Sequence, residues 1–95
     1  MKFENKTVLV TGASGLVGVP LVEKCLLEGA KRVYAVDIRL SDKLLELSKK
    51  YPNDIEVILT DLTYLHNCEN LFNNKIDIVI HAAGIKGSPA RAAKQ

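Results

Sequence analysis

The sequence has few residues of the kinds that build a metal site, a disulfide framework or a secretion signal. Its two cysteines, Cys25 and Cys68, are not spaced as CxxC, and no histidine accompanies them in an arrangement suited to zinc. Both fall within patterns typical of helices, which favours buried thiols over a disulfide or a metal site. Residues 1–6 lack the apolar core and small-residue cleavage pattern of a signal peptide. We therefore expect a reducing, cytoplasmic setting.

Long apolar runs and blocks of like charge are also absent. No apolar run approaches the ~20 residues of a membrane-spanning helix, so a membrane is not an expected partner. The 13 basic and 11 acidic residues give a net charge of +2 and are spread along the chain. Without a basic patch, nucleic acid is not an expected partner either. A length of 95 residues without repeats allows one domain with a modest core.

The sequence does contain a glycine-rich segment between an apolar run and a helical pattern. Residues 7–10 read TVLV, and residues 11–18 then read TGASGLVG. Gly12 suits the turn that leaves a strand, Gly15 would let the backbone approach a pyrophosphate, and Gly18 would let a helix pack on the sheet. The N–H groups of the first helical turn would then face the phosphates. Small residues at an ordinary turn are the alternative, which the following context disfavours.

Strand and helix patterns alternate along the rest of the chain. Crossovers of this length imply parallel strands joined by right-handed connections. We therefore predict an α/β fold, a Rossmann-type doubly wound parallel sheet that stops after about four strands, in the order 3-2-1-4. The predicted strands span residues 6–11, 32–36, 55–59 and 76–81, and the predicted helices span residues 14–28, 42–50, 63–72 and 89–95.

Three residues mark the ends or the shape of the predicted helices. Gly29 is placed to terminate the first helix, and Ser41 to cap the N-terminus of the second. Pro20 lies beyond the first turn predicted for the first helix, where it cannot donate to the carbonyl of Leu16. We therefore expect the first helix to bend at Pro20.

In a sheet of this order, ligands bind outside the carboxyl ends of the strands, at the crevice between strands 1 and 4. Asp37 ends the second strand and is predicted to accept hydrogen bonds from the adenosine ribose. Its charge would repel a 2′-phosphate, which favours NAD over NADP. Arg39 weakens that preference, because a guanidinium can pair with a 2′-phosphate.

Two further stretches reach the same edge of the predicted sheet. Asp61 could accept from the adenine amino group or could cap the helix over residues 63–72, and both possibilities stay open. The small residues Ala82, Ala83 and Gly84 would let the backbone come close to a cofactor ribose. His81 invites a general-base interpretation. A histidine at the end of a buried strand is favoured instead, because no Ser, Thr or carboxylate partner can be named for it.

Taken together, these motifs resemble the N-terminal half of extended short-chain dehydrogenases/reductases, the NAD-dependent epimerase/dehydratase family, which acts largely on nucleotide sugars. The match includes the TGxxGxxG spacing of residues 11–18, Asp37, the pair at 61–62 and the HAAG segment at 81–84. The resemblance implies a cofactor contact near the nicotinamide from Lys86. Together with Arg39, the expected cofactor-binding set is Gly12, Ala13, Ser14, Gly15, Leu16, Val17, Gly18, Asp37, Ile38, Arg39, Asp61, Leu62, Ala82, Ala83, Gly84 and Lys86.

The chain departs from that family in its catalytic elements. Relatives carry a catalytic Ser or Thr on the next strand, then a YxxxK pair and a substrate-binding region. None of Tyr34, Tyr51 and Tyr64 has a lysine at that spacing, since positions 38, 55 and 68 are Ile, Ile and Cys. We therefore expect an NAD(P)-binding Rossmann half-domain over residues 1–95, with no substrate domain, no catalytic residue, no metal and no turnover by this chain alone.

The expected function is the NAD-binding portion of an epimerase/dehydratase-like oxidoreductase, present as a fragment or a truncated product. One alternative is a non-catalytic module or redox sensor that binds NAD(P) without turnover. Another is a half-fold that completes its sheet by pairing with a second copy or another chain on the side of strand 4, which would otherwise leave an open edge.

Overall fold

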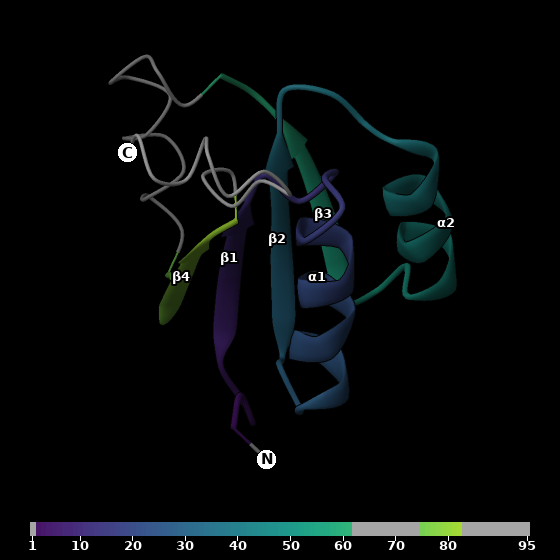
Figure 1. Ribbon diagram of the computed structural model, residues 1–95. Coiled ribbons are helices and arrows are strands. Elements are labelled where there is room, and N and C mark those ends of the chain that lie inside the picture. The colour runs from purple at the N-terminus through teal and green to yellow at the C-terminus, as the bar shows by residue number, and fades with distance from the viewer. Residues whose placement is uncertain (1, 62–74, 83–95) are drawn as a thin grey trace.

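The computed structural model describes residues 2–61 and 75–82, which form a parallel sheet with helices packed against it (Figure 1). All its strands are parallel and follow the order β3-β2-β1-β4, as predicted. The helices predicted over 63–72 and 89–95 lie outside the described residues, as does Cys68. The described elements are β1 (Thr7–Thr11), α1 (Gly18–Leu27), β2 (Arg32–Asp37), α2 (Asp42–Lys50), β3 (Ile55–Leu59) and β4 (Ile78–His81).

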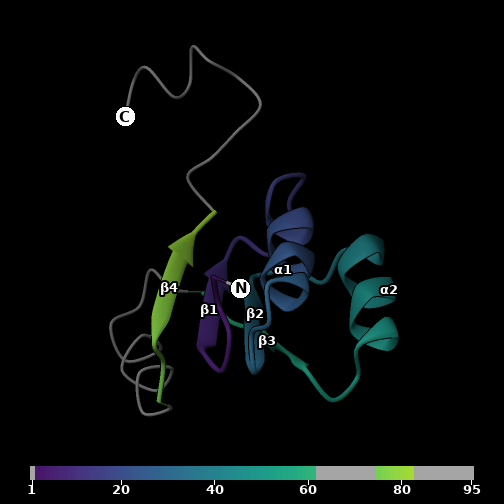
Figure 2. The ribbon, with the colours of Figure 1, turned by 90° about the horizontal axis from the view of Figure 1, so that it is seen from below.

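Both described helices cover the same face of the sheet (Figure 2). The connections from β1 to β2 and from β2 to β3 step across the sheet in the same direction, so right-handed crossovers place α1 and α2 on one side. The return from β3 to β4 reverses that direction, which is the topological feature predicted for the ligand crevice. The core under the helices consists of Val8, Val10, Ala13, Val22, Cys25, Val33, Ala35, Leu44, Leu47, Ile55 and Ala82.

The opposite face of the sheet carries a smaller apolar cluster. Leu9 and Val36 are buried there, and Tyr34, Ile58 and Ile76 pack against them. Because neighbouring residues of a strand point to opposite faces, the apolar runs of β1 and β2 supply both faces. This explains why these strands are continuously apolar and do not alternate.

The thiol of Cys25 lies in the core under α1, as predicted, and is free. Burial raises the pKa of this thiol above its ordinary value. The thiol therefore stays protonated and unreactive at neutral pH. In the part of the chain that the structure describes, no helix is long and apolar enough to cross a membrane.

Helix α1 begins at Gly18, not at residue 14 as predicted. Residues 12–17 form turns instead, with the N–H of Gly15 donating to the carbonyl of Gly12 at 3.1 Å. Pro20 is therefore the third residue of α1 and lies in its first turn, where a missing N–H costs little. The bend was predicted because Pro20 was placed beyond the first turn of the helix. That placement was wrong, so the structure gives no reason to expect a bend at Pro20.

The starts of α2 and β4 lie close to the positions predicted from the sequence. Ser41 caps α2, as predicted, because its hydroxyl accepts the N–H of Leu44 at 3.2 Å. The strand predicted from residue 76 begins at Ile78. The carboxylate of Asp77 accepts the N–H of Thr7 at 2.8 Å and so occupies the donor that an earlier start of the β1–β4 ladder would use.

Gly29 ends α1 as predicted, in the left-handed region at a φ of 94°. Its N–H donates to the carbonyl of Leu26 at 3.0 Å, and the N–H of Ala30 donates to that of Cys25 at 3.0 Å. These two bonds form a Schellman motif, which satisfies carbonyls that the helix itself leaves unpaired.

We expect Gly29→Ala to lower the free energy of unfolding by about 1–2 kcal/mol, because a Cβ strains the left-handed conformation. Gly29→Asn is the matched variant, since asparagine tolerates that conformation better, and it should lose less. Urea unfolding of both variants measures the difference. Equal losses in the two variants would show that backbone conformation is not what selects glycine here.

Candidate functional site

The carboxyl ends of β1, β2 and β4 lie together at one edge of the sheet. In the strand register, Thr11 is the partner of Val36 on one side and of His81 on the other. Asp37 follows Val36 and ends β2. The glycine turn therefore leaves β1 between the end that carries Asp37 and the end that carries His81, as the strand order predicted.

The glycine turn is fixed to β2 by a backbone bond. Gly12 adopts a φ of 69°, which a residue with a side chain rarely adopts, so its predicted role in the turn is confirmed. The next residue, Ala13, is fully buried, and its N–H donates to the carbonyl of Val36 at 3.1 Å. The turn thus has one defined position relative to Asp37.

The other two glycines of the motif meet different surroundings. A Cβ on Gly18 would lie 2.0 Å from the carbonyl oxygen of Gly12 and 2.7 Å from the Cα of Ala13. The start of α1 therefore packs directly on the turn, which refines the prediction that Gly18 packs on the sheet. A Cβ on Gly15 would meet only the Gly12 carbonyl oxygen, at 3.5 Å, so the space beside Gly15 is open.

Several backbone N–H groups at this turn have no acceptor in the part of the chain that the structure describes. Within the described residues, the N–H groups of Leu16, Val17 and Gly18 donate to no backbone carbonyl and to no side chain. Val17 precedes α1 and makes no side-chain capping bond. The Leu16 side chain is exposed. A helix start with unpaired donors and an open approach suits an anion.

The carboxylate of Asp37 is already engaged by the backbone. Its Oδ2 accepts the N–H of Ser14 at 2.9 Å, and its Oδ1 accepts the N–H of Ile38 at 2.7 Å. These bonds were not anticipated from the sequence. Each carboxylate oxygen can accept a second bond, so the group can still receive two hydroxyls while its position is fixed.

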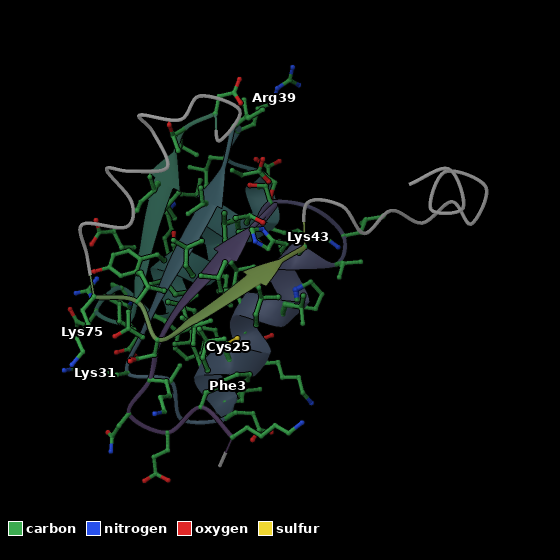
Figure 3. The ribbon with its side chains drawn as sticks, turned by 90° about the vertical axis from the view of Figure 1, so that its left-hand side faces the viewer. Phe3, Cys25, Lys31, Arg39, Lys43 and Lys75 are labelled. Atoms are coloured by element: carbon green, nitrogen blue, oxygen red, sulfur yellow. The ribbon has the colours of Figure 1, made fainter. Side chains whose placement is uncertain are left out.

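A depression of about 510 Å³ lies beside Asp37. Its lining comes from the glycine turn and from the connection between β2 and α2. Arg39 is exposed here, and within the described residues it makes no ion pair. Figure 3 shows Arg39 at the end of the molecule opposite Lys31 and Lys75. The residues that line the depression are Ser14, Gly15, Asp37, Ile38, Arg39, Leu40 and Ser41.

Two more of the predicted residues reach this edge. Asp61 lies two residues beyond the end of β3 and is half-buried. Ala82 is buried, and its N–H donates to the carbonyl of Thr11 at 3.0 Å, which holds this residue against the end of β1. The predicted residues Leu62, Ala83, Gly84 and Lys86 lie outside the described residues.

His81 differs from its predicted surroundings. Its side chain is exposed, and the strand that it ends alternates between half-buried and exposed residues. The structure also gives His81 a hydroxyl partner that the sequence did not predict. Nδ1 of His81 lies 3.2 Å from Oγ1 of the buried Thr11. The strand order could have revealed this pair, because strands 1 and 4 are neighbours and both residues end their strands. Both then point to the same face.

These observations define a class of protein before any comparison. A parallel sheet in the order β3-β2-β1-β4, with a glycine turn after β1 and an acidic residue at the end of β2, is a Rossmann-type domain. The family model of the NAD dependent epimerase/dehydratase family matches residues 8–95, and the chain belongs to that family. The resemblance of the sequence motifs to this family is therefore confirmed.

Curated relatives agree with this family. The chain is 33% identical over 94 residues to a protein from Dictyostelium discoideum described as dehydrogenase/reductase SDR family protein 7-like, covering 86% of this chain and 30% of that protein. It is 34% identical over 88 residues to UDP-glucose 4-epimerase GEPI48 of Cyamopsis tetragonoloba, covering 86% of this chain and 25% of the relative. The chain thus spans about a quarter to a third of the relatives it matches and corresponds to their NAD-binding N-terminal part.

Solved structures share the fold. A short chain dehydrogenase from Leptospira borgpetersenii serovar Hardjo-bovis, with bound NAD+, superposes with a TM-score of 0.71 at 32% identity, over 87% of this chain and 33% of the other. The epimerase Mth375 from Methanothermobacter thermautotrophicus gives a TM-score of 0.66 at 27% identity, over 88% and 24% of the two chains. The α/β fold with this strand order is therefore that of short-chain dehydrogenases.

Proposed function

We propose that this chain binds NAD along the carboxyl edge of its sheet and is the cofactor-binding part of an epimerase/dehydratase-like oxidoreductase. One observation carries the proposal: the N–H groups of residues 16–18, which donate to none of the described residues, lie beside the open space at Gly15 and next to the depression that Asp37 lines. A dinucleotide needs donors for its pyrophosphate and an acceptor for its adenosine ribose, and both are present here. The residues of the edge therefore fit the cofactor that the family uses.

Each part of the edge would serve one part of the cofactor. The segment 12–18 would hold the pyrophosphate with its backbone, and the oxygens of Asp37 would accept the hydroxyls of the adenosine ribose. Ile38 would offer apolar contact to the adenine, whose amino group Asp61 would accept. By family likeness, residues 82–84 with Lys86 would hold the nicotinamide half. The bound dinucleotide would supply hydride transfer.

The same geometry favours NAD over NADP. The carboxylate of Asp37 is held toward the glycine turn by the N–H of Ser14, so a 2′-phosphate at the ribose would meet a fixed negative charge. Arg39 is exposed in the lining of this depression. Its guanidinium would pair with such a phosphate and offset part of the repulsion from Asp37. NAD is thus the proposed cofactor, and NADP a weaker ligand.

Calorimetric titration of the purified chain with NADH and NADPH tests the proposal. We expect saturable binding with NADH preferred by roughly tenfold, which corresponds to about 1.4 kcal/mol. Arg39→Ala should weaken NADPH more than NADH, which widens the preference, because only NADPH carries the phosphate that the guanidinium meets. A folded chain that binds neither dinucleotide would overturn the proposal.

Catalysis by the whole protein is proposed from the family alone. A relative bears the name UDP-glucose 4-epimerase, so a nucleotide sugar is the proposed substrate class. No tyrosine of this chain has a lysine at the YxxxK spacing, so we propose that the chain alone does not turn over a substrate. We also propose that it acts in the cytoplasm, where a free buried thiol such as Cys25 stays reduced.

A half-fold that pairs with another chain is the second candidate. Within the described residues β4 pairs only with β1, so its outer edge presents backbone groups with no strand partner there. The exposed side chains of Val79 and Leu59 add apolar surface on the outer strands. Light scattering of the purified chain tests pairing with a second copy, which predicts twice the mass of one chain.

A further inference from the structure

The connection between β2 and α2, residues 38–41, is held against the glycine turn by one side chain. The hydroxyl of Ser14 donates to the carbonyl oxygen of Arg39 at 2.6 Å and accepts the N–H of Ser41 at 3.1 Å. The backbone N–H of Ser14 also donates to Oδ2 of Asp37. These bonds join residues 23, 25 and 27 positions apart in sequence. Ser14 therefore reaches both ends of the connection.

Other forces that could hold this connection are weak. The side chains of Ile38 and Leu40 are 63% and 39% exposed, so no buried apolar residue anchors it. The Ile38 N–H is taken by the carboxylate of Asp37, which precedes it directly. Among the described residues, the only other bond from outside the connection to the backbone of residues 39–41 is that of the Leu45 N–H, which donates to the Ser41 carbonyl at 2.9 Å in the first turn of α2. Without the Ser14 hydroxyl, the Arg39 carbonyl and the Ser41 N–H would bond to water and would no longer be fixed to the glycine turn.

We propose that Ser14 is a positioning residue that sets the affinity for the adenosine half of the cofactor, an inference that rests on the proposed NAD binding. The hydroxyl fixes residues 38–41 before the ligand arrives, so binding does not have to order them. The connection supplies four of the residues that line the depression at Asp37, namely Ile38, Arg39, Leu40 and Ser41. A mobile connection would present these groups in many positions, and the ordering entropy would subtract from the affinity.

The test compares Ser14→Ala with the unaltered chain by NADH titration and by amide hydrogen exchange without ligand. We expect the Kd for NADH to rise roughly tenfold, because the two hydrogen bonds of the Ser14 hydroxyl that fix the connection are lost from the ligand-free chain. The exchange of residues 39–41 should quicken by a similar factor, while β1 and β2 keep their protection. Ser14→Thr retains a hydroxyl and should restore both properties.

Ser48→Ala is the matched control, because it also removes a side-chain hydroxyl bond, from Ser48 to the carbonyl of Leu45 at 2.7 Å, near the far end of α2. It should change neither NADH affinity nor exchange at residues 39–41. Unchanged affinity or unchanged exchange in Ser14→Ala overturns the positioning role, as does faster exchange throughout the sheet. If the unaltered chain binds no NADH, the proposed function fails and the positioning role fails with it. If it binds and Ser14→Ala binds equally, only the positioning role fails.

Discussion

Gly18→Ala is expected to destabilise the fold by about 2–3 kcal/mol, although alanine is a better helix former than glycine. In an ordinary helical position the change would gain up to ~1 kcal/mol. Here the added Cβ would lie 2.0 Å from the carbonyl oxygen of Gly12 and 2.8 Å from its carbon. Both are backbone atoms of a turn fixed to β2, so α1 or the turn must move. Urea unfolding measures the loss.

Gly15→Ala is the matched control for this prediction. Its Cβ would make only an ordinary contact of 3.5 Å with the Gly12 carbonyl oxygen, and the φ of Gly15 is not positive. We expect stability to stay within ~0.5 kcal/mol of the unaltered chain. NADH affinity should nevertheless fall by roughly tenfold, because the methyl group fills space that the pyrophosphate would approach. Equal destabilisation by the two substitutions would contradict the separate roles assigned to these glycines.

Asp37→Ala is expected to weaken NADH binding by about tenfold to a hundredfold. The substitution removes a charged acceptor for ribose hydroxyls, and hydrogen bonds to charged groups contribute about 1.5–3 kcal/mol. It also releases the N–H groups of Ser14 and Ile38, which the carboxylate now accepts. NADPH should lose less than NADH, because the repulsion of its phosphate disappears together with the favourable bonds. Parallel titrations of the two cofactors measure the change in preference.

The control for Asp37→Ala is Asp54→Ala, which removes the same charge next to the amino end of β3. That end of the sheet lies opposite the proposed site, so NADH affinity should change by less than about twofold. A similar loss in both variants would indicate that net charge, not the position of Asp37, governs binding. An unchanged ratio of NADH to NADPH affinity in Asp37→Ala would remove the basis for assigning NAD.

Much of the molecule follows from patterns that are local in sequence. The apolar runs of β1 and β2, the capping Ser41 and the terminating Gly29 are each decided by a few neighbouring residues. Strand order then follows from the handedness of crossovers, which depends on chirality and not on particular contacts. For these reasons the sequence predicts the parallel sheet, its order and the edge at which Asp37 lies.

The tertiary structure decided what depends on residues far apart in the chain. Helix α1 starts at Gly18, later than predicted, because the turn before it bonds to β2 through Val36 and packs beneath the helix. The Thr11–His81 pair joins residues 70 positions apart, and the Ser14 bonds join residues up to 27 apart. Such contacts exist only once the sheet has brought the strand ends together, so no local pattern specifies them. The sequence determines which groups reach the edge, and the packing of turn, helix and connection determines how they are held there.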